Sequence, residues 1–423
     1  MNHSAATHAE LEAVLKQQRC RVVAHLVRGL GLRHLALAED AVQTAALRAV
    51  ELWPQQGAPT NPAAWLYSVA RHAVIDALRV DGRHDAWPDE DAETAALLPI
   101  QAAHAGRFAS ELDDDELALV FSACHPALPL SSQVALALRA LTDLDLTTIA
   151  AGLLCSEAAL AQRLARARER LASCDLAVPT GNALPPRRDA VLATLALAFH
   201  AGARARARQG LSDDKQAIAL CWEAIWLARA VAAHPVTSHA DADALAAMLL
   251  LHGARLTGQL DPDGHIVLMP GQPRDRWDGG MVRLGLAHLQ AAQRAQRLSR
   301  WHLQAGIAAE HAVAPDHAAT DWQAIVNYYE QLMKLDPSTA PRLSHAIALA
   351  EAGEPARALK LLQVLQPSAP RSLLAHTLAA QARAHERLGE TAQALLLMQH
   401  AAEAAVHPAE ARALLQRAQL LKA

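Results

Sequence analysis

Residues 144–171 read LDLTTIAAGLLCSEAALAQRLARARERL, and this stretch decides the class of fold that the sequence predicts. Apolar residues recur at helical spacing on both sides of a short turn. Ser156 is a good N-cap for the second helix. The positions expected to face the core are Ile149, Ala150, Leu153, Leu160 and Leu164. We therefore predict two short helices joined by a turn.

The remaining face of the second helix is polar and basic. It carries Gln162, Arg163, Arg166 and Arg170. Such a face suits a recognition helix in the major groove, where Arg and Gln reach base edges and phosphates. Taken alone, a solvated basic face on an Ala/Arg-rich helix explains the pattern equally well. Many such motifs place Gly in the turn, where this chain has Leu154, so we expect a different or longer turn.

The composition of the whole chain also favours helices. The chain has 423 residues, of which 52% are hydrophobic and 3% aromatic. This length suggests two to four domains, and the apolar fraction excludes disorder. With few β-branched runs, we predict an all-α fold. No apolar stretch reaches the length of a membrane span, and the N-terminus lacks the pattern of a secretory signal. We therefore expect a cytoplasmic protein with no membrane contact.

Cysteine and histidine spacing argues against metal sites and catalysis. The five cysteines form no C-x-x-C pair, and the histidines show no tight ligand spacing. We predict free buried thiols, no metal, no cofactor and no enzymatic activity. Cys124 and His125 are the only adjacent pair of reactive types, but neighbours in a helix point apart, which disfavours a joint catalytic role.

The N-terminal half divides into helical segments separated by an acidic stretch. Three helices are expected within residues 9–80: one closed by Gly29 and Gly31, one ended by Pro54 and Gly57, and one that starts with Asn61 as N-cap and Pro62. Residues 81–116 hold 11 acidic and 2 basic residues and are predicted to be a linker. Residues 117–175 return to helical spacing, and the Pro/Gly-rich stretch 178–186 predicts a domain boundary.

Residues 188–423 predict helix after helix. Two stretches that each read as helix, Gly turn and helix place Gly353 and Gly389 36 positions apart, near the 34-residue period of tetratricopeptide repeats. We predict a domain of helical-hairpin, tetratricopeptide-like repeats. The sequence DPDG at 261–264 predicts a tight hairpin turn rather than a calcium loop, since the glycine and glutamate of such a loop are not at the required positions.

The motifs together resemble a known family. AEDAVQTAALRAVELWP and NPAAWLYSVARHAVIDALR resemble region 2 of bacterial sigma-70 factors of the extracytoplasmic-function type, and residues 130–172 resemble their region 4. CHPALPLSSQVALALRAL, DRWD and ALAEAGEPARAL resemble the long branch of that family, which carries a helical C-terminal extension. The resemblance covers nearly the whole chain.

The resemblance implies roles for individual residues. Contact with core RNA polymerase, through its β′ and β subunits, is implied for Glu39, Asp40, Gln43, Leu47 and Trp53. Contact with the −10 promoter strand is implied for Trp65, Tyr67, Arg71, His72, Asp76 and Arg79. Contact with the −35 element is implied for Ser156, Gln162, Arg163, Arg166 and Arg170. For the two tryptophans, core packing is an open alternative.

Two functions remain open from the sequence. The first is a sigma factor that binds core polymerase and promoter DNA and is regulated by its C-terminal domain, which could also bind a regulatory protein. The second is a helix-turn-helix DNA-binding regulator on a helical-repeat scaffold that acts without polymerase. Binding to core RNA polymerase distinguishes the two.

Overall fold

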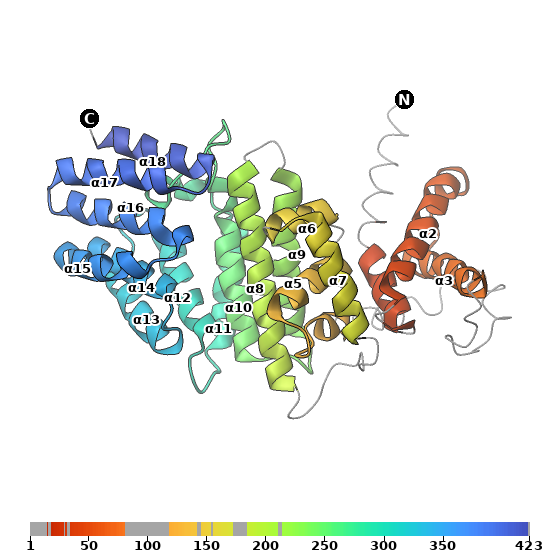
Figure 1. Cartoon of the computed structure of the whole chain (residues 1–423). Coiled ribbons are helices and arrows are strands. Elements are labelled where there is room, and N and C mark those ends of the chain that lie inside the picture. Colours follow the sequence, from red (N-terminus) through yellow and green to blue (C-terminus); the bar gives the residue numbers. More distant parts are fainter. Residues whose placement is uncertain are drawn as a thin grey trace. The chain divides into compact units, whose positions relative to one another are not determined.

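The computed structural model confirms the all-α class (Figure 1). It describes residues 15, 18–28, 30–31, 34–80, 118–141, 145–153, 155–171, 184–209 and 214–421. Over these residues the only β-structure is an isolated antiparallel bridge between Leu260 and Ile266. None of the described helices is long and apolar enough to cross a membrane. The chain divides into two compact units, Met1–Ala198 and Phe199–Ala423.

The first unit contains the N-terminal helices. Residues 18–28 are helical, and the longer elements that follow are α2 (Leu35–Gln56), α3 (Pro62–Val80), α5 (Leu130–Leu141), α6 (Leu146–Gly152), α7 (Glu157–Leu171) and the start of α8 (Leu184–Gln209). Helices α2 and α3 pack against each other, as do α5, α6 and α7. The predicted linker 81–116 and Leu154 lie outside the described residues, as does the Pro/Gly-rich stretch up to residue 183.

Pro54 does not end the second helix, contrary to the expectation from sequence. Helix α2 continues through Pro54 to Gln56 and ends at Gly57, whose φ is +85°. Proline costs most in a helix interior, where it removes a hydrogen bond and clashes with the preceding turn. Here Pro54 lies in the last turn, and the Gly57 N–H still donates to the Trp53 carbonyl at 2.9 Å. The helix therefore ends where glycine allows a left-handed residue.

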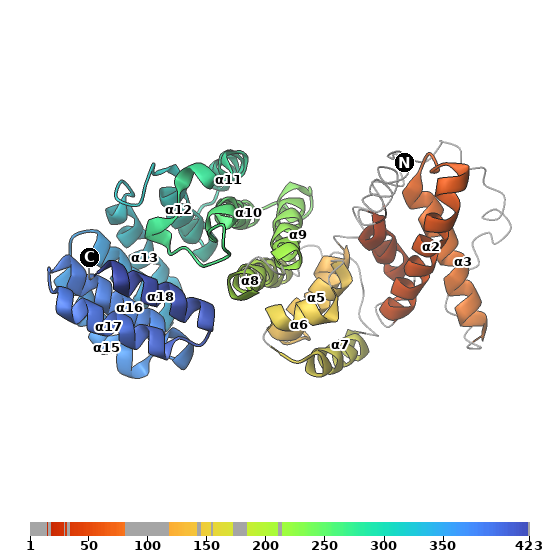
Figure 2. The same cartoon turned by 90° about the horizontal axis from the view of Figure 1, so that it is seen from above.

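The second unit is a succession of helix pairs. It contains the rest of α8, then α9 (Asp214–Ala233), α10 (Ala240–Ala254), α11 (Gly279–Ala292), α12 (Arg300–Val313), α13 (Trp322–Leu335), α14 (Thr339–Glu351), α15 (Pro355–Leu365), α16 (Arg371–Arg387), α17 (Thr391–Ala404) and α18 (Pro408–Leu420). Short 3₁₀ turns lie between them: η5 (Leu256–Gly258), η6 (Met269–Gly271), η7 (Arg274–Arg276) and η8 (Gln366–Ser368). Helices α16, α17 and α18 lie side by side (Figures 1 and 2).

The two predicted helix–glycine–helix units are present. Gly353 joins α14 to α15 and Gly389 joins α16 to α17, both at positive φ (+93° and +78°). After each helix a backbone N–H donates a hydrogen bond to the carbonyl five residues earlier. The Glu354 N–H donates to the Leu349 carbonyl and the Glu390 N–H to the His385 carbonyl, both at 2.9 Å. This is the glycine-capped end that lets one helix turn directly into the next.

Replacing Gly389 with alanine is expected to lower the free energy of unfolding by about 1–2 kcal/mol. The reason is conformational, since a Cβ at this position meets no heavy atom within 4 Å but is unfavourable at positive φ. Urea denaturation followed by circular dichroism measures the change. Gly389→Asn is the control and should lose less, because asparagine tolerates this region of φ. Equal losses in both variants would argue against the conformational cause.

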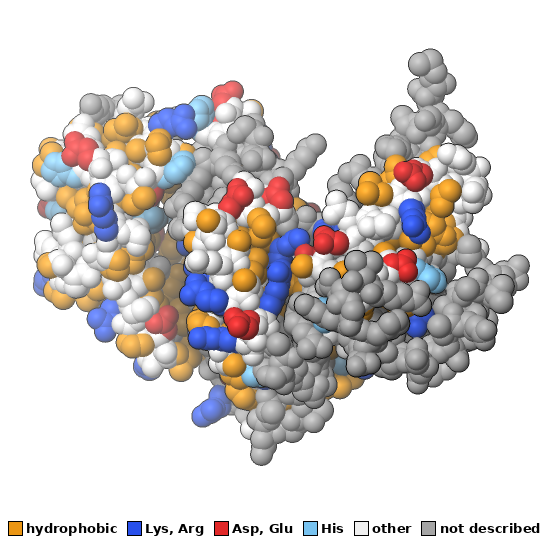
Figure 3. Space-filling model, turned by 45° about the vertical axis from the view of Figure 1, so that its right-hand side comes forward, with side chains coloured by type: hydrophobic (Ala, Val, Ile, Leu, Met, Phe, Trp, Pro, Cys, Tyr) orange, Lys and Arg blue, Asp and Glu red, His pale blue; other side chains and the backbone are white. Residues whose placement is uncertain are grey.

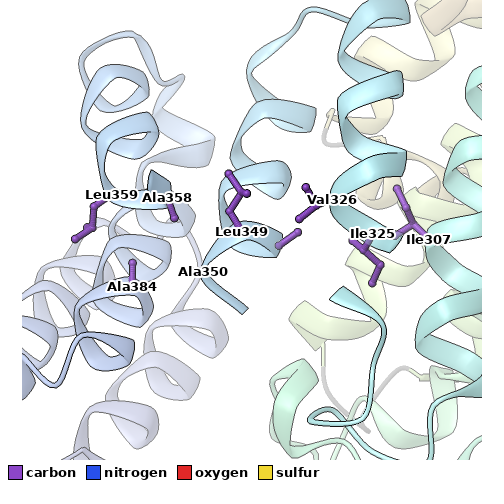
Figure 4. Close-up of a cluster of buried hydrophobic side chains, with 9 residues drawn as sticks. Ile307, Ile325, Val326, Leu349, Ala350, Ala358, Leu359 and Ala384 are labelled. Atoms are coloured by element: carbon purple, nitrogen blue, oxygen red, sulfur yellow. The ribbon is translucent and has the colours of Figure 1, made fainter. Parts of the chain in front are cut away.

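Small side chains let the helices of the second unit approach closely. Figure 4 shows one buried cluster in which Val326 lies between the Ile307 and Ile325 side chains and Leu349, with Ala358 and Ala384 on the far side of Leu349. These side chains come from five successive helices, α12 to α16. Alanine at the crossing points shortens the distance between helix axes, and the apolar residues around it supply the buried surface.

The DPDG stretch forms the predicted hairpin turn. Gly264 has φ +81°, its N–H donates to the Asp261 carbonyl at 3.0 Å, and the Asp261 N–H donates to the His265 carbonyl at 2.9 Å. Asp261 Oδ1 accepts hydrogen bonds from the backbone N–H groups of Asp263 and His265. These backbone hydrogen bonds, more than any other contact, lower the pKa of Asp261. The carboxylate therefore stabilises the turn itself.

Candidate functional site

One face of α2 carries three of the side chains expected to meet polymerase. Asp40, Gln43 and Leu47 are spaced three and four residues apart, so they lie on one side of the helix, and all three are exposed. The Leu47 side chain is 61% exposed and Val50, one turn further, is 38% exposed. We call Asp40, Gln43, Leu47 and Val50 the α2 face. This face is polar at its start and apolar at its end, a combination that is typical of a docking surface.

Glu39 does not join the α2 face. It is buried, and its Oε2 accepts a hydrogen bond from Arg139 Nη2 of α5 at 2.8 Å. Burial raises the pKa of Glu39, and the charges of Arg139 and Arg168 only partly oppose that rise. The partner lies 100 residues away in the sequence, so spacing alone gave no sign of this ion pair. Glu39 therefore contacts other parts of its own unit.

Trp53 is also directed inward. It is buried at the end of α2 and packs edge to face against Trp65 of α3, with ring centroids 5.3 Å apart. Trp65 remains half-buried. The geometry is the favoured one for aromatic pairs. For Trp53 the structure thus shows the core-packing alternative, and Trp65 both supports that core and keeps part of its ring accessible.

Helix α3 begins as the sequence predicts, and it carries the other residues that are expected to contact the −10 strand. Asn61 Oδ1 accepts the N–H of Ala64 at 3.1 Å, which caps the helix. The Tyr67 ring lies edge to face on His25, 4.6 Å between centroids. His72 and Asp76, one turn apart, are exposed, while Arg71 is half-buried. The side chain of Arg79 lies outside the described residues.

Helices α6 and α7 are each capped by a side chain. Asp145 Oδ1 accepts the N–H of Thr148 at 2.7 Å, and Ser156 Oγ accepts the N–H of Ala159 at 3.2 Å. Thr147 donates from its hydroxyl to Glu157 Oε1 at 2.8 Å, which ties the two helices together. Of the predicted core positions, Leu153 is half-buried and the others are buried. Ser156, expected to meet DNA, therefore already uses its oxygen as a cap acceptor.

The outer face of α7 carries the basic residues. Gln162, Arg166 and Arg170 are exposed and Arg163 is half-buried. Arg168 turns to the other side, where it is close enough to Glu39 for their charges to interact, and burial is the main factor that lowers its pKa. Figure 3 shows Lys and Arg side chains gathered near the middle of the face that comes forward in that view. The residues of the α7 face, Gln162, Arg163, Arg166 and Arg170, can meet phosphates and base edges from one helix side.

The one adjacent pair of reactive residue types lacks the features of a catalytic pair. Cys124 is fully buried, and burial raises the pKa of its thiol to about 12, against smaller lowering effects of Thr194 and Arg187. Burial also lowers the pKa of His125. A nucleophilic cysteine needs the opposite shift, toward the thiolate. Of the other described cysteines, Cys221 is buried, Cys20 and Cys155 are half-buried, and all are free thiols.

Comparison with known proteins assigns two parts of the chain. Residues 16–84 match the sigma-70 region 2 family, and residues 187–293 match a family of unknown function, DUF6596. The chain is 36% identical over 341 residues to the uncharacterized protein R00370 of Rhizobium meliloti (strain 1021). The aligned stretch covers 79% of this chain and 78% of that protein. No solved structure matches. The chain therefore belongs to one family with this Rhizobium meliloti protein, and it carries a sigma-70 region 2 domain, the domain of bacterial transcription initiation factors.

Proposed function

We propose that this protein is a sigma factor of the extracytoplasmic-function type that binds core RNA polymerase and directs it to promoters. The observation that carries the proposal is the region 2 match over residues 16–84, within which α2 presents Asp40, Gln43 and Leu47 on one exposed face. Exposed apolar surface of this kind is what a protein partner covers on binding.

Promoter recognition is assigned to two helices. On α3, the half-buried Trp65 and Tyr67 offer aromatic surface and the half-buried Arg71 a positive charge, the combination that single-stranded bases and their backbone require. On α7, the basic face offers Gln162, Arg163, Arg166 and Arg170 as the recognition helix of a region 4. The two modules would read the −10 and −35 elements respectively.

The C-terminal helical domain is assigned a regulatory role. Successive helical hairpins form extended surfaces that bind proteins or peptides, and α14 to α17 form two helical hairpins of that kind. A chain truncated after residue 209 tests this role, because it retains α8, whose Thr194 contacts Cys124 of the first unit. Altered transcription by the truncated chain supports regulation, and unchanged transcription removes it.

Run-off transcription with core RNA polymerase tests the function as a whole. The template is the DNA upstream of the protein's own gene, and the expected result is a discrete transcript that requires the protein. A pull-down with core polymerase separates the proposal from a helix-turn-helix regulator that binds DNA alone. DNA binding without any polymerase binding would favour that regulator.

Removing the arginines of the α7 face is expected to weaken −35 binding. Arg163→Ala and Arg166→Ala should each reduce affinity, and loss of a phosphate contact should lower the slope of log K against log salt by about one. Footprinting and salt titration of the holoenzyme measure both effects. Arg371→Ala, at an exposed position of α16, is the control and should leave the footprint unchanged. An unaltered footprint in both α7 variants would refute this recognition helix.

A further inference from the structure

Two arginines of the second unit lie against the same tryptophan. Arg255 follows the end of α10, and Arg274 and Trp277 belong to the segment of η7. The guanidinium carbon of Arg274 is 4.0 Å from the centroid of the Trp277 ring, and that of Arg255 is 5.3 Å from it. Both contacts are within the range of cation–π attraction. We call these three residues the Trp277 cluster.

Several donors of the Trp277 cluster are buried without an acceptor. Within the part of the chain that the structure describes, no acceptor forms a hydrogen bond with Arg255 Nε, Arg274 Nη1, Arg274 Nη2 or Trp277 Nε1. The hydrogen bond that Arg255 does make is long, with 3.4 Å between its Nη2 and Gln272 Oε1. A buried donor left unsatisfied costs about 1–3 kcal/mol, and more when it is charged. Four such atoms in one place therefore call for an acceptor.

Nearby carboxylates do not supply that acceptor. Asp316 is close enough for its charge to act on Arg274, but the two form no ion pair within 4 Å in the described chain, and Asp316 Oδ1 accepts the N–H of Ala319 at 2.8 Å. Burial, followed by the charge of Arg274, lowers the pKa of Arg255 to about 10. The Arg255 guanidinium group therefore remains charged at neutral pH.

A neutral histidine adds a further polar atom. His311 packs edge to face on Trp322, 5.2 Å between centroids, and its Nδ1 is buried without a hydrogen-bond partner among the described residues. Burial, with smaller contributions from the charges of Arg255, Arg274 and His317, lowers its pKa to about 3. The influence of both arginines on His311 indicates that it lies close to the Trp277 cluster.

We propose that the Trp277 cluster binds a compact oxyanion of the phosphate class. The guanidinium group presents its N–H donors in a planar fork that matches phosphate oxygens, and a charged acceptor makes the strongest such hydrogen bonds. Two guanidinium groups and an indole N–H supply positive charge and directed donors together. The oxyanion can be free phosphate or the phosphoryl group of a small ester, since the recognising chemistry is the same.

Isothermal titration of the full-length protein tests the proposal. Inorganic phosphate and glycerol 3-phosphate are titrated separately at constant ionic strength maintained with sodium chloride. Saturable binding of one-to-one stoichiometry is expected for at least one of them. The ligand that binds more tightly shows whether the site prefers free phosphate or the phosphoryl group of a small ester. Arg274→Gln should weaken binding by at least about tenfold, because it removes both the charge and the fork.

Arg276→Gln is the matched control. Arg276 lies in the same turn as Arg274 but is exposed, so binding should persist in this variant. If Arg274→Gln does not fold by circular dichroism, Arg274→Lys takes its place, since it keeps the charge but lacks the fork and should still bind several-fold more weakly. The absence of saturable binding to the unaltered protein, or equal binding by the Arg274 variant that folds, overturns the proposal.

Discussion

Replacing Glu351 with alanine is expected to lower the free energy of unfolding by about 3–5 kcal/mol. The Glu351 side chain is only 4% exposed, and its carboxylate accepts from Arg383 at 2.5 and 3.1 Å and from Arg387 at 2.8 Å. Both arginines belong to α16, so the carboxylate at the end of α14 joins two helical hairpins. Breaking a buried ion pair from one side leaves the opposite charges uncompensated. Chemical denaturation followed by circular dichroism measures the loss.

Glu354→Ala is the matched control for this prediction. Glu354 lies three residues further on and pairs with Arg357 at 3.1 Å, but both side chains are exposed, 42% and 53%. Exposed ion pairs contribute about 0–1 kcal/mol, so this variant should be nearly as stable as the unaltered protein. Similar losses in the two variants would mean that the buried network does not stabilise the hairpins.

The same carboxylate predicts how stability depends on pH. Burial alone would raise the pKa of Glu351, but the polar contact with His317, the hydrogen bonds from Arg383 and the charges of Arg383 and Arg387 together hold it at about 2. A pKa lower in the folded than in the unfolded state gives stability that is present above about pH 4.5 and is lost as the pH falls toward 2. The loss is about 3 kcal/mol. The denaturant concentration at the unfolding midpoint should therefore fall as the pH is lowered from 6 to 2. This decrease should be smaller in Glu351→Gln, which has no carboxylate to protonate at this position.

Truncating Leu47 is expected to reduce binding to core RNA polymerase by about tenfold to hundredfold. A leucine that is 61% exposed in the free protein gains most of its burial energy only when a partner covers it. Full burial of such a side chain contributes about 1.5–3 kcal/mol, of which Leu47→Ala removes the greater part. Equilibrium binding to core polymerase measures the change, and run-off transcription should fall in parallel at limiting protein concentrations.

Leu415→Ala is the control for the docking prediction. Leu415 lies on α18 and is 47% exposed, so its truncation removes a similar exposed side chain outside the α2 face. Both variants should unfold within about 0.5 kcal/mol of the unaltered protein, since neither side chain is in a core. Unchanged polymerase binding by Leu47→Ala would exclude the α2 face as the docking surface.

The local features of the fold could be predicted because neighbouring residues determine them. Asn61 and Ser156 cap helices where the sequence placed them, and Gly353 and Gly389 end helices at positive φ. Of the two residues predicted to end α2, Gly57 does and Pro54 does not, because a proline near a helix end costs little once glycine closes the helix three residues later. The spacing of Leu160 and Leu164 correctly predicted the buried side of α7, and therefore also its outer basic face.

Contacts between distant residues could not be predicted in the same way. Glu39 was expected to face polymerase, yet it pairs with Arg139, and Trp53 packs on Trp65. Nothing in the sequence marks Arg255 and Arg274 as neighbours of one indole ring, or Glu351 as the acceptor of two arginines. The assignment of Glu39 to the polymerase contact remains a prediction, and it would require the ion pair with Arg139 to open.

By itself the sequence determined the all-α class, the helix ends and the two helix–glycine–helix hairpins, because backbone hydrogen bonding and helical periodicity act over a few residues. Only the tertiary structure decided which charged and aromatic side chains are buried against residues far away in the sequence. That depends on which helices pack together, and a buried charge persists only where packing brings an opposite charge or a hydrogen bond to it. Glu39 and Asp40 are adjacent in the sequence, but packing buries the first and leaves the second on the α2 face.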